Sequence, residues 1–212
     1  MDISVIVQLY NEAESLPELT AWIERVMQEN GYTYEIIFIN DGSTDNSWNV
    51  IEELKKKNDC IHGIKFRRNH GKSPALYCGF KRAKGDVVIT MDADLQDPPE
   101  VIPQMIAKWQ EGFDVVYGKR LKREGDSFFK KFTAKVFYRT LNKLTDTEIP
   151  VDTGDFRLID RKVCDALKNN ISEKNRYVRG IISWLGFKSA PVEFIREKRF
   201  AGTTKYPLKK ML

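Results

Sequence analysis

Two hydrophobic periodicities alternate along the first 118 residues of the 212-residue chain. Short runs rich in Val, Ile and Phe are typical of buried strands, which we expect at 3–9, 34–40, 61–66, 86–91 and 115–118. Apolar residues at helical spacing predict helices at 15–29, 44–57, 72–83 and 99–109. Ser15, with Glu18 three residues later, predicts a capping box at the first helix. This alternation predicts an α/β fold, with a mostly parallel central sheet flanked by helices.

Polar residues follow each of the first four predicted strands, in the segments 10–12, 41–45, 67–72 and 92–97. In open α/β sheets, ligands bind beyond the carboxyl ends of the strands. Turn and capping chemistry is the alternative for any one of these segments, and for 41–45 taken alone it explains the residues about as well as function does. Four such segments in succession favour a binding site at this edge of the sheet.

The strongest single feature is Asp92-Ala93-Asp94, at the exit of the fourth predicted strand. Residues two apart in extended chain project to the same side, and two carboxylates there repel each other unless a cation intervenes. A hard divalent cation such as Mg²⁺, bridging to phosphates, suits this oxygen-rich site, to which Gln96 adds a further oxygen. No His or Cys lies nearby, which argues against structural zinc.

Composition narrows the class of protein. With 42% hydrophobic and 31% charged residues, the chain is typical of soluble globular proteins, and disorder is excluded. No stretch approaches the roughly 20 apolar residues of a bilayer span, so a multi-pass membrane protein is excluded for these residues. Three scattered cysteines fit a reducing cytosol. Neither a phosphate-binding P-loop nor a dinucleotide-binding glycine motif is present.

Charge is unevenly distributed along the chain. Residues 1–118 carry 12 Lys and Arg against 19 Asp and Glu, whereas residues 119–212 carry 23 against 11. The basic half predicts an anionic partner: nucleic acid, a membrane surface or a phosphorylated substrate. An apolar stripe with interleaved Lys and Arg over 128–144 fits either a helix packed on the sheet or a helix lying on an anionic membrane. A further amphipathic pattern begins where the sequence ends, so we expect transmembrane helices to follow.

Six motifs occur in order, at 6–12, 40–45, 92–99, 117–120, 137–139 and 154–158. Together they resemble inverting family-2 glycosyltransferases of the GT-A fold. Within that family they are most similar to the polyprenyl-phosphate glycosyltransferases, the group of dolichol-phosphate mannose synthase and bactoprenol glucosyltransferase. The resemblance covers nearly the whole chain.

The resemblance implies roles for individual residues. Asp155 matches the position assigned as catalytic base. The residues implied to bind the nucleotide sugar are Leu9, Tyr10, Glu12, Asp41, Lys72, Asp92, Ala93 and Asp94. Those implied to hold Mg²⁺ or Mn²⁺ are Asp92, Asp94 and Gln96. Those implied to bind the acceptor and other phosphates are Arg120, Arg123, Lys131, Arg157, Arg199 and Lys205.

Two positions modify this picture. The family usually has proline where this chain has Gln8, and Gln8 restores a backbone donor and adds an amide near the base pocket. A phosphate monoester has a second pKa of about 6, so a lipid phosphate is largely dianionic and needs a general base less than a hydroxyl does. We therefore expect Asp155 to orient the acceptor or an arginine, or to stabilise positive charge on the sugar. A structural pairing of Asp155 with Arg157 is the alternative.

The function that the resemblance implies is metal-dependent, inverting transfer of glucose or a related hexose from a UDP-sugar to undecaprenyl or another polyprenyl phosphate. It would occur at the cytoplasmic face of the membrane and modify cell-envelope glycans. Residues 1–118 would form the donor and metal half of a single GT-A domain, and 119–212 the acceptor half. No nucleic-acid partner is expected, and a homo-oligomer is left open. The alternatives are GDP-mannose as donor, a soluble saccharide or protein hydroxyl as acceptor, or a non-catalytic module that binds anionic surfaces.

Overall fold

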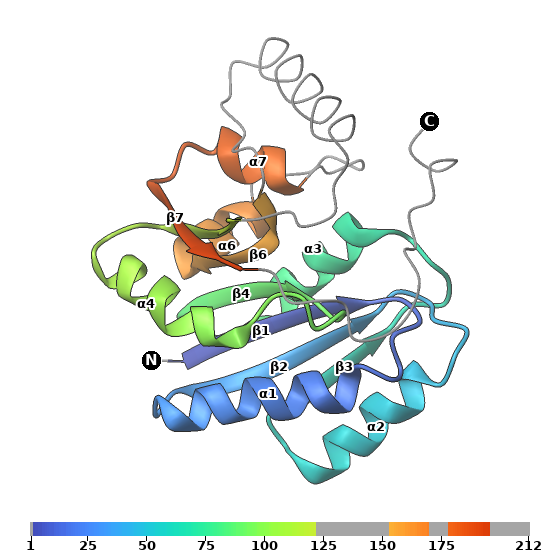
Figure 1. The fold of residues 1–212 in the computed structure, drawn as a ribbon. Coiled ribbons are helices and arrows are strands. Elements are labelled where there is room, and N and C mark those ends of the chain that lie inside the picture. The colour runs from blue at the N-terminus through green and yellow to red at the C-terminus, as the bar shows by residue number, and fades with distance from the viewer. Residues whose placement is uncertain (1, 122–152, 170–177, 196–212) are drawn as a thin grey trace, which may run out of the picture.

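The computed structural model describes residues 2–121, 153–169 and 178–195, which form one sheet with helices on both faces (Figure 1). The strands are β1 Asp2–Leu9, β2 Thr33–Asn40, β3 Ile61–Lys65, β4 Val87–Asp92, β5 Val115–Arg120, β6 Thr153–Asp160 and β7 Ser189–Phe194. They lie in the order β3-β2-β1-β4-β6-β5-β7. The sheet therefore continues across residue 118, where the sequence divides into an acidic and a basic half.

Among the described strands of this sheet, β6 runs opposite to the other six. Strands β3, β2, β1 and β4 are parallel neighbours, β6 is antiparallel to both β4 and β5, and β7 is parallel to β5. The predicted α/β fold with a mostly parallel, helix-flanked sheet is confirmed. The hydrophobic pattern does not predict β6, because Asp155 and Arg157 interrupt its apolar run. It also does not predict β7, a short strand in which exposed and buried residues alternate.

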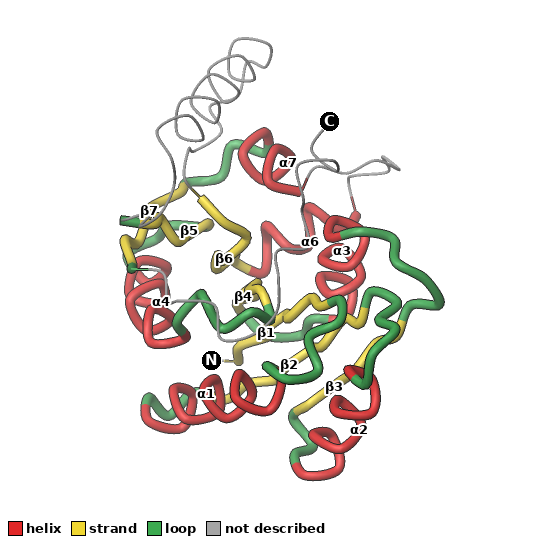
Figure 2. Tube along the Cα trace, turned by 45° about the vertical axis from the view of Figure 1, so that its right-hand side comes forward, coloured by secondary structure: helices red, strands yellow, loops and turns green. Residues whose placement is uncertain are grey.

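Helices cover both faces of the sheet (Figures 1 and 2). One face carries α1 (Leu16–Glu29), α2 (Ser47–Lys57) and α4 (Ile102–Gln110), which follows the short 3₁₀ helix η1 (Pro99–Val101). The other carries α3 (Lys72–Arg82), α6 (Arg161–Asn169) and α7 (Val178–Trp184).

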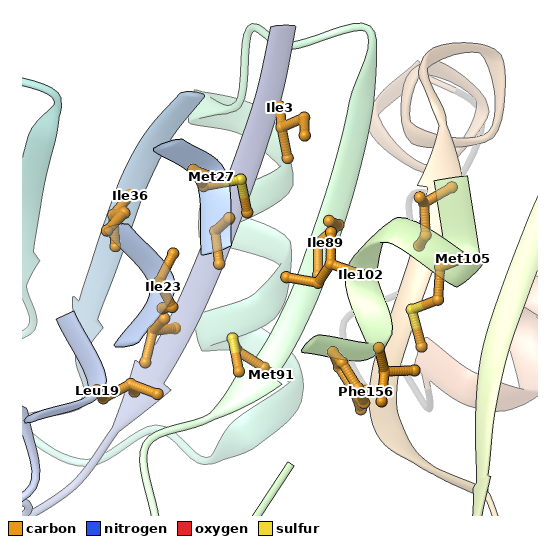
Figure 3. Packing of buried hydrophobic residues seen from close by; sticks show 14 of the residues in the cluster. Ile3, Leu19, Ile23, Met27, Ile36, Ile89, Met91, Ile102, Met105 and Phe156 are labelled. Atoms are coloured by element: carbon orange, nitrogen blue, oxygen red, sulfur yellow. The ribbon is translucent and has the colours of Figure 1, made fainter. Parts of the chain in front are cut away.

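Side chains that alternate along β1 separate two hydrophobic cores. Val5 and its neighbours two residues away face α1 and α4, in the core that Figure 3 shows around Ile23 and Met105. Ile6 faces the opposite way, into a core that includes Phe80 of α3. Each fully buried aliphatic or aromatic side chain stabilises the fold by roughly 1.5–3 kcal/mol. Both faces of the central strands are thus anchored, which fixes where the strands end.

The capping box predicted at the start of α1 is wrong. Ser15 has helical backbone angles, φ −86° and ψ −22°, and its side chain makes no capping hydrogen bond. Instead its hydroxyl donates to the carbonyl oxygen of Glu12 at 3.0 Å, within the preceding turn. Pro17 lies in the first turn of α1, where a missing N–H costs the helix nothing.

Candidate active site

The carboxyl ends of β1, β2, β3 and β4 meet at one edge of the sheet, since these strands are parallel. Hydrogen bonds tie the loop after β1 to the loop after β2. The backbone N–H of Asn11, at a positive φ of 55°, donates to Ser43 Oγ at 2.9 Å. The next N–H, of Glu12, donates to Ser47 Oγ at 3.0 Å. The two loops are therefore held as one unit, and it includes Glu12, a predicted nucleotide-binding residue.

Asp41, predicted to contact the nucleotide, lies buried at the end of β2. Its two carboxylate oxygens accept the backbone N–H groups of His70 at 2.7 Å and Gly71 at 2.8 Å. Burial raises the pKa of Asp41, although these two hydrogen bonds oppose the rise. Gly42 follows at φ +71°, and a Cβ there would lie 2.3 Å from the backbone of Arg68. Asp41 thus also organises the loop between β3 and α3.

Three other residues predicted to bind the nucleotide sugar flank these loops. The side chains of Leu9 and Ala93 are each 3% exposed and belong to the core, so only their backbone atoms remain available to a ligand. The carbonyl oxygen of Leu9 accepts the N–H of Asp41 at 2.9 Å. Tyr10, the residue after β1, is partly buried.

Lys72, the first residue of α3, joins two carboxylates from different strands. Its Nζ donates to Oδ1 of Asp92, the last residue of β4, at 2.6 Å. It also forms an ion pair with Oδ2 of Asp155, in β6. The structure thereby brings together three predicted site residues that are far apart in sequence. We call Lys72, Asp92 and Asp155 the lysine bridge.

Electrostatics favour the charged form of the lysine bridge. Burial by itself lowers the pKa of Lys72, but the charges of Asp92 and Asp155 outweigh it and hold the pKa above its ordinary value. Burial by itself raises the pKa of Asp92, but the nearby ammonium outweighs it and holds the pKa below its ordinary value. At neutral pH the bridge therefore contains a positive charge between two negative ones.

Gln8 also reaches the carboxylate of Asp92. Its Nε2 donates to Asp92 Oδ1 at 2.6 Å, the same oxygen that Lys72 contacts. The two residues are register partners on the adjacent strands β1 and β4. The sequence places an amide near the base pocket, whereas the structure directs it to the candidate metal ligand. This contact follows from the pairing of β1 with β4, which the sequence alone does not specify.

Asp94 and Gln96 complete the loop after β4. Asp94 is 7% exposed, and its Oδ1 accepts the backbone N–H of Gln96 at 3.4 Å. Leu95 between them has a positive φ of 59° and is buried in the core. Within 2–121, 153–169 and 178–195, no group of three or more His, Cys, Asp or Glu is placed to hold a metal ion. Two carboxylates fit Mg²⁺ or Mn²⁺ when substrate phosphates supply further oxygens, as is common for Mg²⁺.

Two predicted phosphate-binding arginines lie on the β5–β6 side. Arg120 Nη2 is 3.9 Å from Oδ1 of Asp97, whose side chain is fully buried. Arg120 also lies against Gly154, where a Cβ would come within 2.6 Å of Nη2. Arg157 is 6% exposed and donates to the carbonyl oxygen of Gly154 at 3.1 Å. The sequence does not single out Asp97 as a site residue, although it is the third acid of the 92–97 segment.

The remaining predicted phosphate-binding residues lie outside the described residues. They are Arg123, Lys131, Arg199 and Lys205. The apolar stripe of 128–144 also falls there, so its two interpretations stay predictions. Among the helices that are described, none combines the length and the apolar character needed to cross a bilayer.

Comparison with known proteins identifies the family. Residues 4–168 match the model of the glycosyl transferase family 2. The chain belongs to this family. It is 50% identical over 209 residues to an uncharacterized glycosyltransferase, YkcC, of Bacillus subtilis, covering 99% of this chain and 64% of that protein. It is 41% identical over 206 residues to the bactoprenol glucosyl transferase of Shigella phage SfV, covering 97% and 67%. The predicted resemblance to this family is confirmed.

Solved structures give the same fold. Glucosyl-3-phosphoglycerate synthase from Mycobacterium tuberculosis, in complex with Mn²⁺, UDP and phosphoglyceric acid, superposes with a TM-score of 0.65 at 19% identity, over 99% of this chain and 73% of that one. The mannosyltransferase PcManGT from Pyrobaculum calidifontis, in complex with GDP-Man and Mn²⁺, superposes at 0.64 and 19%, over 94% and 57%. At this identity the likeness establishes the GT-A fold. The chain spans 64% of the length of the Bacillus relative.

Proposed function

We propose that this glycosyltransferase moves glucose or a related hexose from a UDP-sugar to a polyprenyl phosphate, with inversion at the anomeric carbon. Support for the acceptor comes from relatives named bactoprenol glucosyl transferase, at 41–42% identity over 97% of the chain. The single observation that carries the proposal is the lysine bridge, in which one ammonium contacts both Asp92 and Asp155. It sets the candidate donor-binding and catalytic carboxylates side by side.

The chemistry of the acceptor accounts for the state of Asp155. A phosphate monoester is largely dianionic at neutral pH, because its second pKa is about 6, so it attacks without losing a proton. An Asp155 carboxylate paired with an ammonium is suited to orienting groups and to stabilising positive charge on the sugar, rather than to taking up a proton. When bound to Asp92, Asp94 and Gln96, Mg²⁺ or Mn²⁺ would neutralise the charge that develops on the departing diphosphate.

Two anions must meet in this reaction, the donor diphosphate and the lipid phosphate, and cationic side chains must lie between them. Residues 119–212 carry 23 Lys and Arg, among them the candidates Arg120 and Arg157. We assign this half to the acceptor and residues 1–118 to the donor. The acceptor lipid places the reaction at a membrane surface, which we propose to be the cytoplasmic face.

The decisive experiment is transfer of radiolabelled sugar. The protein is incubated with polyprenyl phosphate in detergent and with each of a panel of UDP- and GDP-sugars, with and without EDTA. We expect label from a UDP-hexose to enter the organic-extractable lipid fraction, and EDTA to prevent it.

Other results would point elsewhere. If only GDP-mannose gave lipid product, the donor would be GDP-mannose instead of a UDP-sugar. Water-soluble product would mean that the acceptor is a saccharide or protein hydroxyl. No product with any donor, together with tight binding to anionic liposomes, would favour a non-catalytic surface-binding module. Full transfer in the presence of EDTA would show that the reaction does not need a divalent cation.

A further inference from the structure

The carboxylate of Asp92 is held at one oxygen from two directions. Oδ1 accepts both the Lys72 ammonium from α3 and the Gln8 amide from β1, each at 2.6 Å. A carboxylate only accepts hydrogen bonds, so Gln8 must present its NH₂ group. Both donors act on Oδ1, and together they fix the rotation of the carboxylate about its bond to the chain.

The two donors differ in charge. Lys72 neutralises part of the negative charge on Asp92 and divides its contacts between Asp92 and Asp155. Gln8 is neutral, so it orients the carboxylate while leaving its charge available to a cation. A neutral donor that holds a charged ligand is the arrangement by which neighbouring groups tune metal sites in proteins.

The two donors also differ in rigidity. Lys72 reaches Asp92 through four flexible methylene groups, whereas Gln8 lies directly beside it in the register of two paired central strands. The neighbours of Gln8 in β1, Val7 and Leu9, are buried in the core at 0% and 3% exposure. The backbone from which the amide extends is therefore fixed on both sides.

We propose that Gln8 is a positioning residue, which holds the carboxylate of Asp92 in the orientation that binds the divalent cation and, through it, the donor diphosphate. This inference rests on the proposed metal-dependent function. Gln8 acts through Asp92 and does not touch the nucleotide. Its contribution is consequently confined to binding that involves the cation.

The test measures Mn²⁺ and UDP binding by isothermal titration calorimetry with the full chain. Gln8→Met keeps the length of the side chain and removes the donor, and Gln8→Asn withdraws the amide by one methylene while keeping a polar side chain. Gln104→Met is the matched control, because Gln104 is exposed on α4. We expect both Gln8 variants to bind Mn²⁺ in the presence of UDP about tenfold more weakly, as for other groups that orient metal ligands, and the control to match the wild type. Affinity for UDP without metal stays unchanged.

Three results would overturn the proposal in distinguishable ways. Unchanged Mn²⁺ affinity in both Gln8 variants removes the positioning role and leaves the proposed function intact. An equal loss of affinity for UDP alone makes Gln8 a nucleotide contact instead. A wild-type protein that binds no Mn²⁺ with UDP overturns the metal dependence, and the role of Gln8 with it.

Discussion

The strands on either side of β4 contribute to the site in different ways. β1 runs parallel to β4, so the loop that follows it reaches the site, and hydrogen bonds such as the one from the Asn11 N–H to Ser43 Oγ hold that loop in place. β6 runs antiparallel, so its beginning lies beside the end of β4. The register pairs Thr90 with Arg157, and continuing it by two residues sets Asp155 opposite Asp92. One side supplies a braced loop, and the other supplies charged side chains directly from a strand.

This contrast shows why the two sides differ in their tolerance of change. On the β1 side, several hydrogen bonds hold the loops together, so each one contributes only modestly to the free energy of unfolding. On the β6 side, a few charges are held within a largely buried setting, where removing one leaves its partner uncompensated. The lysine bridge belongs to the second kind, because one ammonium contacts both Asp92 of β4 and Asp155 of β6.

The largest effect is expected on the β6 side, from Asp155→Asn. The amide keeps the size of the side chain but loses the charge that Lys72 contacts. Turnover in the radiolabelled lipid assay should fall by at least about a hundredfold, the lower range for a group acting directly in catalysis. Affinity for UDP, measured by calorimetry, should be retained. Turnover that survives nearly intact would remove both catalytic roles of Asp155 and leave it a structural residue.

Breaking the bridge itself should be the next largest effect. Lys72→Met leaves the carboxylates of Asp92 and Asp155 facing each other without a cation. The free energy of unfolding in urea should fall by about 2–3 kcal/mol, below the usual range for a fully buried pair because Lys72 and Asp92 keep some exposure. Lys56→Met removes an exposed lysine paired with Glu53 and is the control, for which we expect little change. Equal stability of the two variants would contradict a stabilising bridge.

The pH dependence of the folding stability tests whether the lysine bridge is charged. The pKa of Asp92 is lowered in the folded state, so its contribution is present above the unfolded value, about 3.9, and is lost as pH falls through the folded value. The pKa of Lys72 is raised, so its contribution is present below about 10.4 and is lost as pH rises through the folded value. The stability difference between wild type and Lys72→Met should therefore persist at pH 7 and shrink toward both limits. Urea unfolding across pH measures it, and a difference that vanishes at pH 7 would contradict the charged bridge.

The smallest effect is expected on the β1 side, from Ser47→Ala. Ser47 is buried, and its hydroxyl accepts the N–H of Glu12 at 3.0 Å and donates to Asp45 Oδ1 at 2.5 Å. Loss of the hydroxyl should lower the free energy of unfolding by about 1–2 kcal/mol, because it removes one neutral hydrogen bond and one to a solvent-exposed carboxylate. Thermal denaturation checks this, with Ser73→Ala as a partly buried serine control in the first turn of α3. A loss as large as that of Lys72→Met would erase the distinction between the two sides.

Much of this site could be predicted from the sequence because its chemistry is concentrated at strand ends. Asp92 and Asp94 follow an apolar run that identifies β4, and Asp41 follows another that identifies β2. The sequence indicates Asp155 only through the motif of 154–158, since its strand carries two charged residues in its buried stretch. The predicted capping box at Ser15 is wrong because the Ser15 hydroxyl donates to the carbonyl oxygen of Glu12 in the preceding turn. The spacing of residues does not distinguish these two hydrogen bonds.

The sequence by itself determined the alternation of strands and helices, the acidic segment after β4 and the family. These depend on the order of residues along the chain, through local periodicity and motif. Only the tertiary structure decided that Gln8 lies on Asp92 and that Lys72 joins Asp92 to Asp155. Such contacts depend on which strands pair, in which direction and in what register, and the packing of both sheet faces sets these together.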